Sequence, residues 1–493
     1  MWATRNRIEQ PAESPWQAVP LARWLRAAGI ALAILGGVTV AEGQPASSRD
    51  TTNAREKAAS AAAVRVARSR APVLGLARCL QLAERNYPKI HEARAEVRKS
   101  QADRRRAYWT PYSQMKITGA AGLVPSLSGT NLYSEQTDVS IDSNMSLAWQ
   151  TGVEWGIPLW TFGKISNVWD AADANVLVKE HQVRKARNEV LLDVRRAYYG
   201  AQLAHDALAL VREAMRRIDR HLDRMARAVE EGEGDDIELL KLRMYRAELD
   251  ARASEAEKQR RVALAGLRFL TGIQGQFEIS SEPLHKIRHR LGPLLRYLTA
   301  ARLYRPEINM ARAGVRARQA QLQMERARFY PDIALGLRWK WGRAPDVVDQ
   351  RNPFVSDSLN YHSYVAGLVL KWDFEPIPTA ARLAAARAEL EKMRATERFA
   401  LGGVGVEVEE AYAEAEDATR RLDAYESAVG YAKQWLIKVQ QGIDVGMMDD
   451  EEIVDPAKEY ALKRFSLMTA TFDYNLALAR LALATGWDEV APP

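Results

Sequence analysis

The sequence predicts an α+β protein with four long amphipathic strands and very long helices, arranged as two tandem repeats. Three observations support this fold class. The two halves of the chain carry matching residues in the same order, four segments alternate apolar and polar residues, and two stretches run for more than 60 residues without proline. At 493 residues the chain exceeds one ordinary compact core, and an elongated repeat architecture accommodates that length.

The N-terminal region has the order of a secretory signal. Arg23 and Arg26 precede an apolar run, Ala27–Val40, which is followed by small and polar residues. We expect a signal peptide over residues 1–43 and a disordered segment over 44–72. The apolar run is shorter than the roughly 20 residues that a transmembrane helix needs, and no other stretch reaches that length, so we expect no helical membrane anchor.

The tandem repeat is visible when the chain is compared with itself. Thr271-Gly272 recurs as Thr485-Gly486, an offset of 485 − 271 = 214. Upstream, Tyr87–Ile90 matches Arg305–Ile308 at an offset of 306 − 88 = 218. A repeat of this kind indicates one supersecondary unit used twice.

We place repeat 1 at residues 73–290, repeat 2 at 291–487 and a C-terminal tail at 488–493. Each repeat is expected to contain a helix of 20 to 25 residues, a strand, a polar loop, a second strand, a very long helix, a turn and another helix.

Period-two alternation predicts the strands. It is clear in Ser146–Leu159, Asp332–Gly342 and Tyr364–Phe374, and weak in Lys116–Leu123. Strands of this length suit a tilted crossing of a bilayer, and tryptophans near their ends suit the aromatic girdles of outer-membrane barrels. The alternative is the core of a soluble sheet. Polar positions such as Glu154, Arg338 and Lys340 are expected on the face opposite the apolar one.

Proline punctuates the junctions between helices and strands because it lacks the amide donor that either element needs. The proline-free stretches Gly163–Glu231 and Thr379–Gln441 between these junctions predict helices on the order of 90 to 100 Å long. Gly402-Gly403 and Gly405 weaken the second helix, which suggests a bend or a close helix contact. The junction prolines are Pro111, Pro158, Pro331, Pro376 and Pro378.

Several motifs occur in order in both halves of the chain and resemble those of the TolC-like outer-membrane efflux protein family. They are Arg85-Asn86-Tyr87-Pro88, the Val194, Ala197 and Tyr198 set with its copy at Val408, Ala411 and Tyr412, and the helix endings Leu267–Gly272 and Tyr474–Ala479. The resemblance covers nearly the whole mature length. It implies a homotrimer whose chains each give four strands to a 12-stranded transmembrane β-barrel, continued by an α-helical barrel in the periplasm.

The same resemblance implies the function and the location. The protein would be an outer-membrane exit duct for efflux or type I secretion, a passive conduit coupled to an inner-membrane transporter through a periplasmic adaptor protein. Trimerisation agrees with the physics, because a four-stranded sheet alone would leave its edge groups unpaired in lipid. Residues 273–304 and those after 487 would form a belt, and loops 125–144 and 343–361 would face outside the cell.

The turns between the helices of each hairpin carry the candidate site. The resemblance implies a periplasmic aperture here, and we expect an electronegative one that favours cations. The alternative is that these acidic residues only begin the following helices, where the helix dipole favours them. The aperture residues are Asp235, Asp236, Asp444, Asp449 and Asp450.

The adaptor contact is expected at the same turns. Adaptor-docking members of the family carry a Gly-Leu-Ser/Thr element there, whereas this chain has Gly232-Glu233-Gly234 and Gly446-Met447-Met448. We assign the contact to Gly232, Gly446, Met447 and Met448, because methionine gives an adaptable apolar surface.

No residue pattern predicts an enzyme, a cofactor or a metal site. His285 and His289 stand four residues apart without a third ligand, and the single cysteine, Cys79, is expected to be a small buried residue. The balanced charge and the absence of a basic patch predict no nucleic-acid partner. The alternative to the duct is a soluble periplasmic coiled-coil adaptor or scaffold protein, and the sequence leaves the cargo, the pump and the adaptor open.

Overall fold

The computed structural model describes residues 72–128, 140–232, 235–349, 357–448 and 450–488. The predicted signal peptide, nearly all of the predicted disordered segment, Asp449 and most of the C-terminal tail therefore lie outside the described residues. All of the described residues belong to one compact unit, residues 71–493, which we call the described unit.

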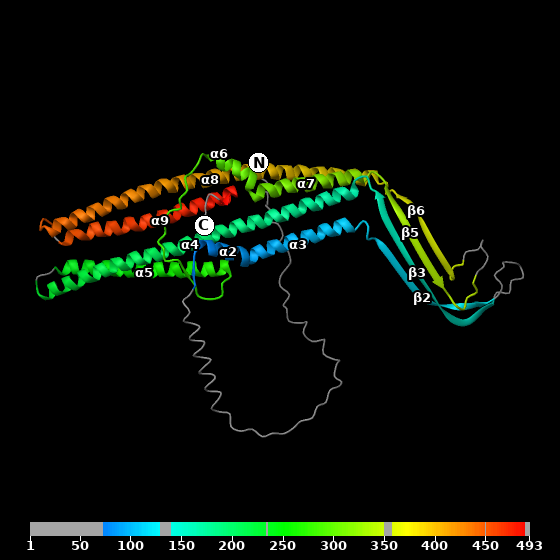
Figure 1. The fold of residues 1–493 in the computed structure, drawn as a ribbon, viewed down its shortest axis with the longest axis horizontal. Helices are drawn as coiled ribbons and strands as arrows, with labels where there is room; N and C mark the ends of the chain where they lie inside the picture. Colours follow the sequence, from blue (N-terminus) through cyan, green and yellow to red (C-terminus); the bar gives the residue numbers. More distant parts are fainter. Residues whose placement is uncertain (1–71, 129–139, 233–234, 350–356, 449, 489–493) are drawn as a thin grey trace, which may run out of the picture. The chain divides into compact units, whose positions relative to one another are not determined.

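Long helices and one four-stranded sheet make up the described unit (Figure 1). In chain order the elements are β1 (Val73–Leu74), α2 (Leu76–Asn86), α3 (Pro88–Trp109), β2 (Met115–Ser128), β3 (Ser140–Trp160), α4 (Lys164–Glu230), α5 (Asp236–Thr271), β4 (Glu278–Ile279), α6 (Leu294–Tyr304), α7 (Pro306–Ala327), β5 (Asp332–Arg343), β6 (Tyr361–Lys371), α8 (Pro376–Asp444), the 3₁₀ turn η1 (Asp450–Ile453) and α9 (Val454–Thr485).

The two very long helices lie where the proline-free stretches predict them. Helix α4 has 67 residues and α8 has 69. Helix α8 continues through Gly402, Gly403 and Gly405, and within the described residues no atom of another element lies within 4 Å of a Cβ built on any of the three. A close helix contact within the chain is therefore not the reason for these glycines.

Each repeat opens with two helices, where the sequence predicted one. Pro88 begins α3 and Pro306 begins α7, and the residues before them, Tyr87 and Arg305, have extended backbones. A proline disfavours the helical conformation of the residue that precedes it, so α2 and α6 end there. Helix α2 is absent from the prediction, and α6 was predicted as part of the belt.

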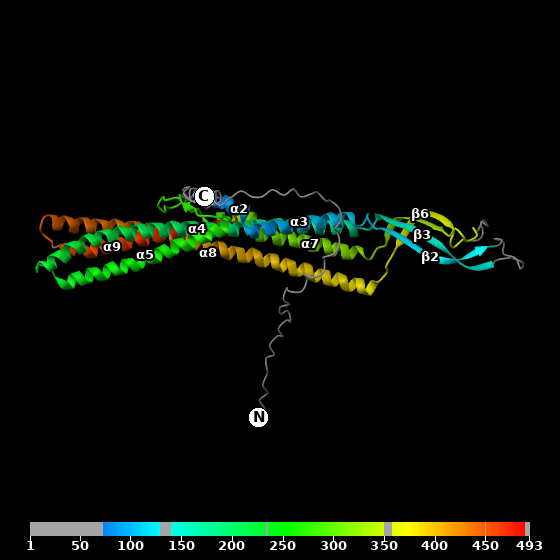
Figure 2. The same ribbon diagram turned by 90° about the horizontal axis from the view of Figure 1, so that it is seen from below.

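The sheet is antiparallel throughout, in the order β2-β3-β5-β6. Figure 2 shows the strands beyond the ends of α3, α4, α7 and α8. Strands β2 and β3 are longer than predicted and extend to Ser128 and from Ser140, so the prediction of a loop over 125–144 is wrong at both ends. The polar residues there end the period-two pattern, although backbone pairing continues.

Repeat-equivalent residues form the centres of two separate hydrophobic clusters. Val194 and Leu267 are fully buried in one, and Val408 and Leu481 occupy the same places in the other. The Thr-Gly motif ends α5 and α9 in the same way. Each threonine hydroxyl donates to the carbonyl four residues back, and each following glycine has φ near +68° (69° and 67°), a conformation that glycine adopts at a helix C-terminus without steric cost.

An irregular segment, residues 282–293, crosses the helices and is held to them by side chains; we call it the strap. The fully buried Asn475 accepts from the backbone N of Ile287 and donates to the carbonyl of His285, both at 3.0 Å. Tyr474 Oη donates to the carbonyl of His289 at 3.0 Å, and Asp206 accepts from the backbone N of Leu284 at 2.7 Å. These bonds satisfy strap groups that have no ladder partner.

Replacing Asn475 by Ala should destabilise the protein. The substitution leaves a backbone donor and a backbone acceptor unpaired, which costs about 1–3 kcal/mol for each group that stays dry. We expect a lower Tm and faster proteolysis within the strap.

Asn309→Ala is the matched control, because the side chain of Asn309 donates one hydrogen bond, to the carbonyl of Leu303 at 3.1 Å. Equal thermal unfolding of the two variants would show that Asn475 does not hold the strap.

Candidate functional site

One face of the sheet is apolar across all four strands. The register places Ile117 opposite Val153, Val153 opposite Trp339, and Trp339 opposite Tyr364. No element of the described unit covers this face, and Leu368 is 75% exposed. A large exposed apolar surface marks contact with a partner or with lipid. The face also contains Leu147, Trp149, Trp155, Ile157, Ile333, Leu335, Leu337 and Leu370.

Aromatic rings gather where the strands meet the helices. Phe162 stacks on Tyr330 with ring centroids 5.1 Å apart, and Trp372 lies 4.9 Å from Phe374. Farther along the strands, Trp149 packs edge-on against Trp341 at 4.4 Å. Rings beside the helical ends of the strands and rings farther along the strands match the two aromatic belts of a transmembrane barrel.

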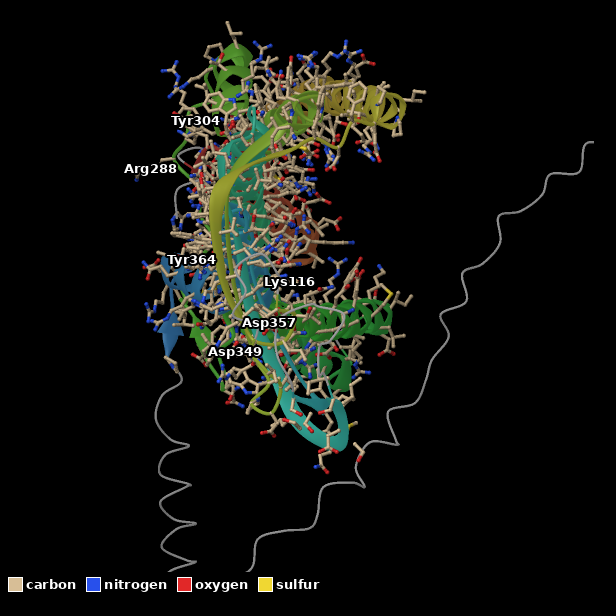
Figure 3. All side chains as sticks on the ribbon, turned by 90° about the vertical axis from the view of Figure 1, so that its right-hand side faces the viewer. Lys116, Arg288, Tyr304, Asp349, Asp357 and Tyr364 are labelled. Atoms are coloured by element: carbon tan, nitrogen blue, oxygen red, sulfur yellow. The ribbon has the colours of Figure 1, made fainter. Side chains whose placement is uncertain are left out.

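The opposite face of the sheet is polar. Lys116, Glu154 and Arg338 occupy one row across three strands, and Arg338 Nε lies 3.1 Å from Glu154 Oε1. Figure 3 shows Lys116 and Tyr364 on opposite sides of the sheet, with Lys116 on the side toward which α5 and α8 extend. The predicted separation of Glu154, Arg338 and Lys340 from the apolar residues is therefore present.

Both outer edges of the sheet lack a pairing strand in the described unit. Strand β2 pairs only with β3, and β6 pairs only with β5. The free N–H and C=O groups of these edges need partners wherever water is excluded. A single copy of this sheet cannot satisfy them.

The turn between α4 and α5 is built on Gly232, whose φ is +82°. Asp235 caps α5 by accepting a hydrogen bond from the backbone N of Ile237 at 2.8 Å, and Asp236 begins the helix. An N-cap aspartate is worth about 1 kcal/mol. Two of the predicted aperture residues therefore have the helix-starting role that was the alternative interpretation.

Asp444 does not fit that alternative. It is the last residue of α8, where the helix dipole disfavours a carboxylate, and its Oδ1 accepts a hydrogen bond from Gln440 Nε2 at 2.9 Å. Of the other two predicted aperture residues, Asp449 lies outside the described residues, and only the backbone of Asp450, in η1, is described.

The two methionines of the second turn differ in their surroundings. Gly446 has φ +74° and reverses the chain. Met448 packs against Gly442, where an added Cβ would lie 2.7 Å from its sulfur, whereas Met447 is 84% exposed. Of the residues predicted for the adaptor contact, Met447 therefore offers the freest side chain.

An ion pair and a cation–π contact are among the contacts that connect α9 with the other hairpin. Arg464 of α9 lies 3.5 Å from Glu213 of α4, and the Lys458 ammonium lies over the ring of Tyr245 in α5, 4.8 Å from its centroid. Partly exposed pairs of this kind contribute little each, so the packing of α9 against α4 is not due mainly to these two pairs.

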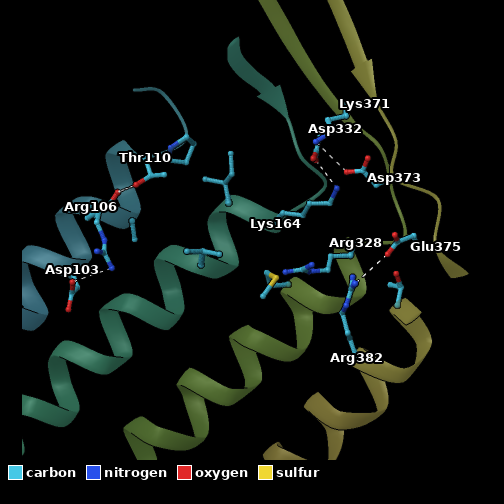
Figure 4. Close-up of a pocket in the computed structure, with 16 residues that line it drawn as sticks. Asp103, Arg106, Thr110, Lys164, Arg328, Asp332, Lys371, Asp373, Glu375 and Arg382 are labelled. Atoms are coloured by element: carbon cyan, nitrogen blue, oxygen red, sulfur yellow. Dashed lines mark hydrogen bonds and ion pairs between the residues drawn. The ribbon is translucent and has the colours of Figure 1, made fainter. Parts of the chain in front are cut away.

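A hollow of about 660 Å³ lies at the junction of helices and strands (Figure 4). Charged side chains from α3, α4, α7, α8 and the ends of β5 and β6 line it. Lys164 Nζ lies 2.8 Å from both Asp332 Oδ1 and the carbonyl of Tyr330, and Arg382 lies 3.3 Å from Glu375. This hollow was not predicted from the sequence; its signals were Asp332 and Glu375, the charged residues beside the junction prolines Pro331 and Pro376.

The histidines and the cysteine have ordinary surroundings. His285 Nδ1 lies 3.1 Å from the carbonyl of Pro283, and His289 Nε2 lies 3.1 Å from Tyr297 Oη. Cys79 is fully buried, which raises its pKa to about 11. Among the described residues, no group of three His, Cys, Asp or Glu side chains could hold a metal ion.

Among the described helices, none combines the length and the apolar character that crossing a membrane requires.

A family model described as "Outer membrane efflux protein" matches residues 79–273 and 297–487. The chain belongs to the outer membrane efflux protein family. The predicted fold class and the predicted outer-membrane location are confirmed, and the resemblance to TolC-like proteins is explained.

Individual relatives of this efflux-family protein are distant. It is 26% identical to the cation efflux system protein CusC of Escherichia coli O157:H7 over 254 residues, which is 50% of each chain. It is 24% identical to the alkaline protease secretion protein AprF of Pseudomonas aeruginosa, over 64% of each chain. The alignment to CusC therefore spans about half the length of that relative.

A solved structure shows the same fold over a larger part of the chain. The open state of the MtrE outer membrane channel of Neisseria gonorrhoeae superposes with a TM-score of 0.68 at 17% identity, covering 83% of this chain and 88% of that one.

Proposed function

We propose that three copies of this efflux-family protein form a passive exit duct through the outer membrane. The observation that carries the proposal is the four-stranded sheet with one uncovered apolar face and two unpaired edges. Because the strands alternate in direction, β6 of one copy can pair in antiparallel fashion with β2 of the next. A closed ring of three sheets then has lipid outside and water inside.

Energy for transport would come from an inner-membrane transporter, reached through a periplasmic adaptor protein. The family supports an outer-membrane conduit and no catalytic role. The relatives are named for cation efflux and for protease secretion, so either class of cargo fits the duct. We assign the adaptor contact to the helix turns, with Met447 as its principal side chain, and the aperture to the acidic residues of the same turns.

A charge on the apolar face should prevent assembly. Leu368→Lys places an ammonium against lipid, at a cost of about 2–4 kcal/mol per chain near the bilayer centre. We expect less trimer in the outer membrane, measured by envelope fractionation and by native mass in detergent.

Val369→Lys is the matched control, because Val369 is the next residue of β6, points to the polar face and is 50% exposed. Loss of trimer in both variants, or in neither, would contradict the assignment of lipid and water to the two faces.

Neutralising Asp444 should reduce the cation preference of the aperture. Asp444→Asn keeps the size of the side chain and its acceptor for Gln440 Nε2, and removes one negative charge per chain. Reversal potentials in planar bilayers should shift toward anions, and Asp235→Asn should shift them similarly without unfolding α5, since asparagine is an equally good N-cap. Unchanged selectivity in both variants would contradict the assignment of the aperture to these acidic residues.

A charge at Met447 should disrupt adaptor binding. Met447→Glu places a carboxylate at the most exposed apolar position of the turn, and we expect at least a tenfold weaker affinity in pull-down titrations with the cognate adaptor. Met447→Leu keeps an apolar side chain and should bind as the natural chain does. Full adaptor binding by Met447→Glu would show that Met447 is not part of the adaptor contact.

A further inference from the structure

The polar face of the sheet carries more cations than carboxylates. Lys116, Arg338 and Lys340 share the middle of this face with one acid, Glu154. In the row of Lys340 the other strands contribute Gly152, Thr118 and Ser363, none of which is charged.

The single carboxylate in the middle of this face already forms an ion pair. Glu154 pairs with Arg338 at 3.1 Å, and no ion pair within the described residues involves Lys116 or Lys340. The nearest acid along β5 is Asp332, six residues from Arg338, or about 20 Å along a strand, and it is bound to Lys164. The positive charge in the middle of this face is therefore not neutralised locally.

The glycines of this face let neighbouring side chains lie along the wall. The ring of Tyr361 lies over Gly342, and its hydroxyl donates to Gln150 Oε1 at 3.1 Å. The stem of Lys340 passes Gly152, with its Cγ 3.6 Å from where a Cβ would be. Small and flat neighbours leave the ammonium and guanidinium groups as the protruding charges of this surface.

We infer that Lys116, Arg338 and Lys340 form a band of positive potential on the inner wall of the barrel, which favours anionic cargo. The recognising chemistry is that of ammonium and guanidinium groups with carboxylates or phosphates. The inference rests on the proposed function, since it takes the polar face as the inner wall. Trimerisation brings three copies of the band into one lumen, where low-dielectric walls focus the potential.

The band has the opposite sign to the helix turns. Asp235, Asp236 and Asp444 lie at the far end of the long helices, so a solute would meet acidic groups first and basic groups last. Ion selectivity of the whole duct reports mainly its narrowest part, so the band requires a local measurement.

A reporter thiol at Ser363 measures the potential beside Lys340, which it faces directly across β5 and β6. Ser363→Cys is nearly isosteric, and the natural Cys79 is fully buried with its pKa raised to about 11 by burial, so it gives little background. Assembled trimers are treated with an anionic and with a cationic methanethiosulfonate. Each rate is divided by the rate of the same reagent with a small free thiol, and the anionic value is then divided by the cationic value. A change in the ionisation of the reporter thiol affects both values equally and therefore cancels from this ratio.

We expect this ratio to favour the anionic reagent by at least about tenfold, because a potential of a few kT acts in opposite directions on the two reagents. Lys340→Gln in the Ser363→Cys protein should lower the ratio severalfold, and Lys340→Arg should preserve it. Raising the ionic strength to about 1 M, where the Debye length is about 3 Å, should also lower it.

The outcomes separate the two proposals. Equal reaction with both reagents overturns the band and leaves the duct intact. A thiol that reacts with neither reagent in the trimer, yet reacts after unfolding, shows that the face is not lined by water and overturns the duct itself. If Ser363→Cys does not assemble, Val365→Cys, opposite Arg338 on the same face, gives the same readings.

Discussion

Backbone hydrogen bonding in lipid is the constraint on which the rest of this structure depends. Hydrocarbon offers no partner for a free N–H or C=O group, so strands can cross it only within a closed sheet. This chain supplies four strands, an apolar face and two unpaired edges. The remaining strands must come from other copies. The proposed duct, its lumen and the proposed charge on its inner wall all follow from that requirement.

The two repeats share their buried residues and differ in their exposed turns. Val194, Leu267 and Thr271 have positional counterparts in Val408, Leu481 and Thr485, and both sets are buried. The turns at the tips have diverged, with an aspartate cap in one and two methionines in the other. Buried packing tolerates few residue types at each position, whereas an exposed turn tolerates many, so the two repeats agree in their buried residues and differ in their turns.

Much of the fold could be predicted from the sequence because its signals are local. The absence of proline predicts α4 and α8 to within a few residues, and period-two alternation predicts the central part of each strand. Ser128 and Ser140 were misassigned because exposed strand ends need no alternation. The strap and the charged hollow at Lys164 join residues more than 150 positions apart in sequence, and no local pattern records such contacts. At the turns, the residue types marked both Asp235 and Asp444 as candidate aperture residues. The sequence did not show that Asp235 caps α5 whereas Asp444 ends α8.

The unequal lengths of the helices determine where the shorter helix of each hairpin is anchored. Helices α4 and α8 run without interruption from the strands to the tips, so each is about 100 Å long. Helices α5 and α9 are the shorter helices of the two hairpins, with 36 and 32 residues, and they end at Gly272 and Gly486. Both of these glycine ends are packed: Asn86 Nδ2 donates to the carbonyl of Thr271, and a Cβ at Gly486 would lie 2.9 Å from the backbone of Tyr304. The shorter helix of each hairpin is therefore anchored at the end opposite its tip.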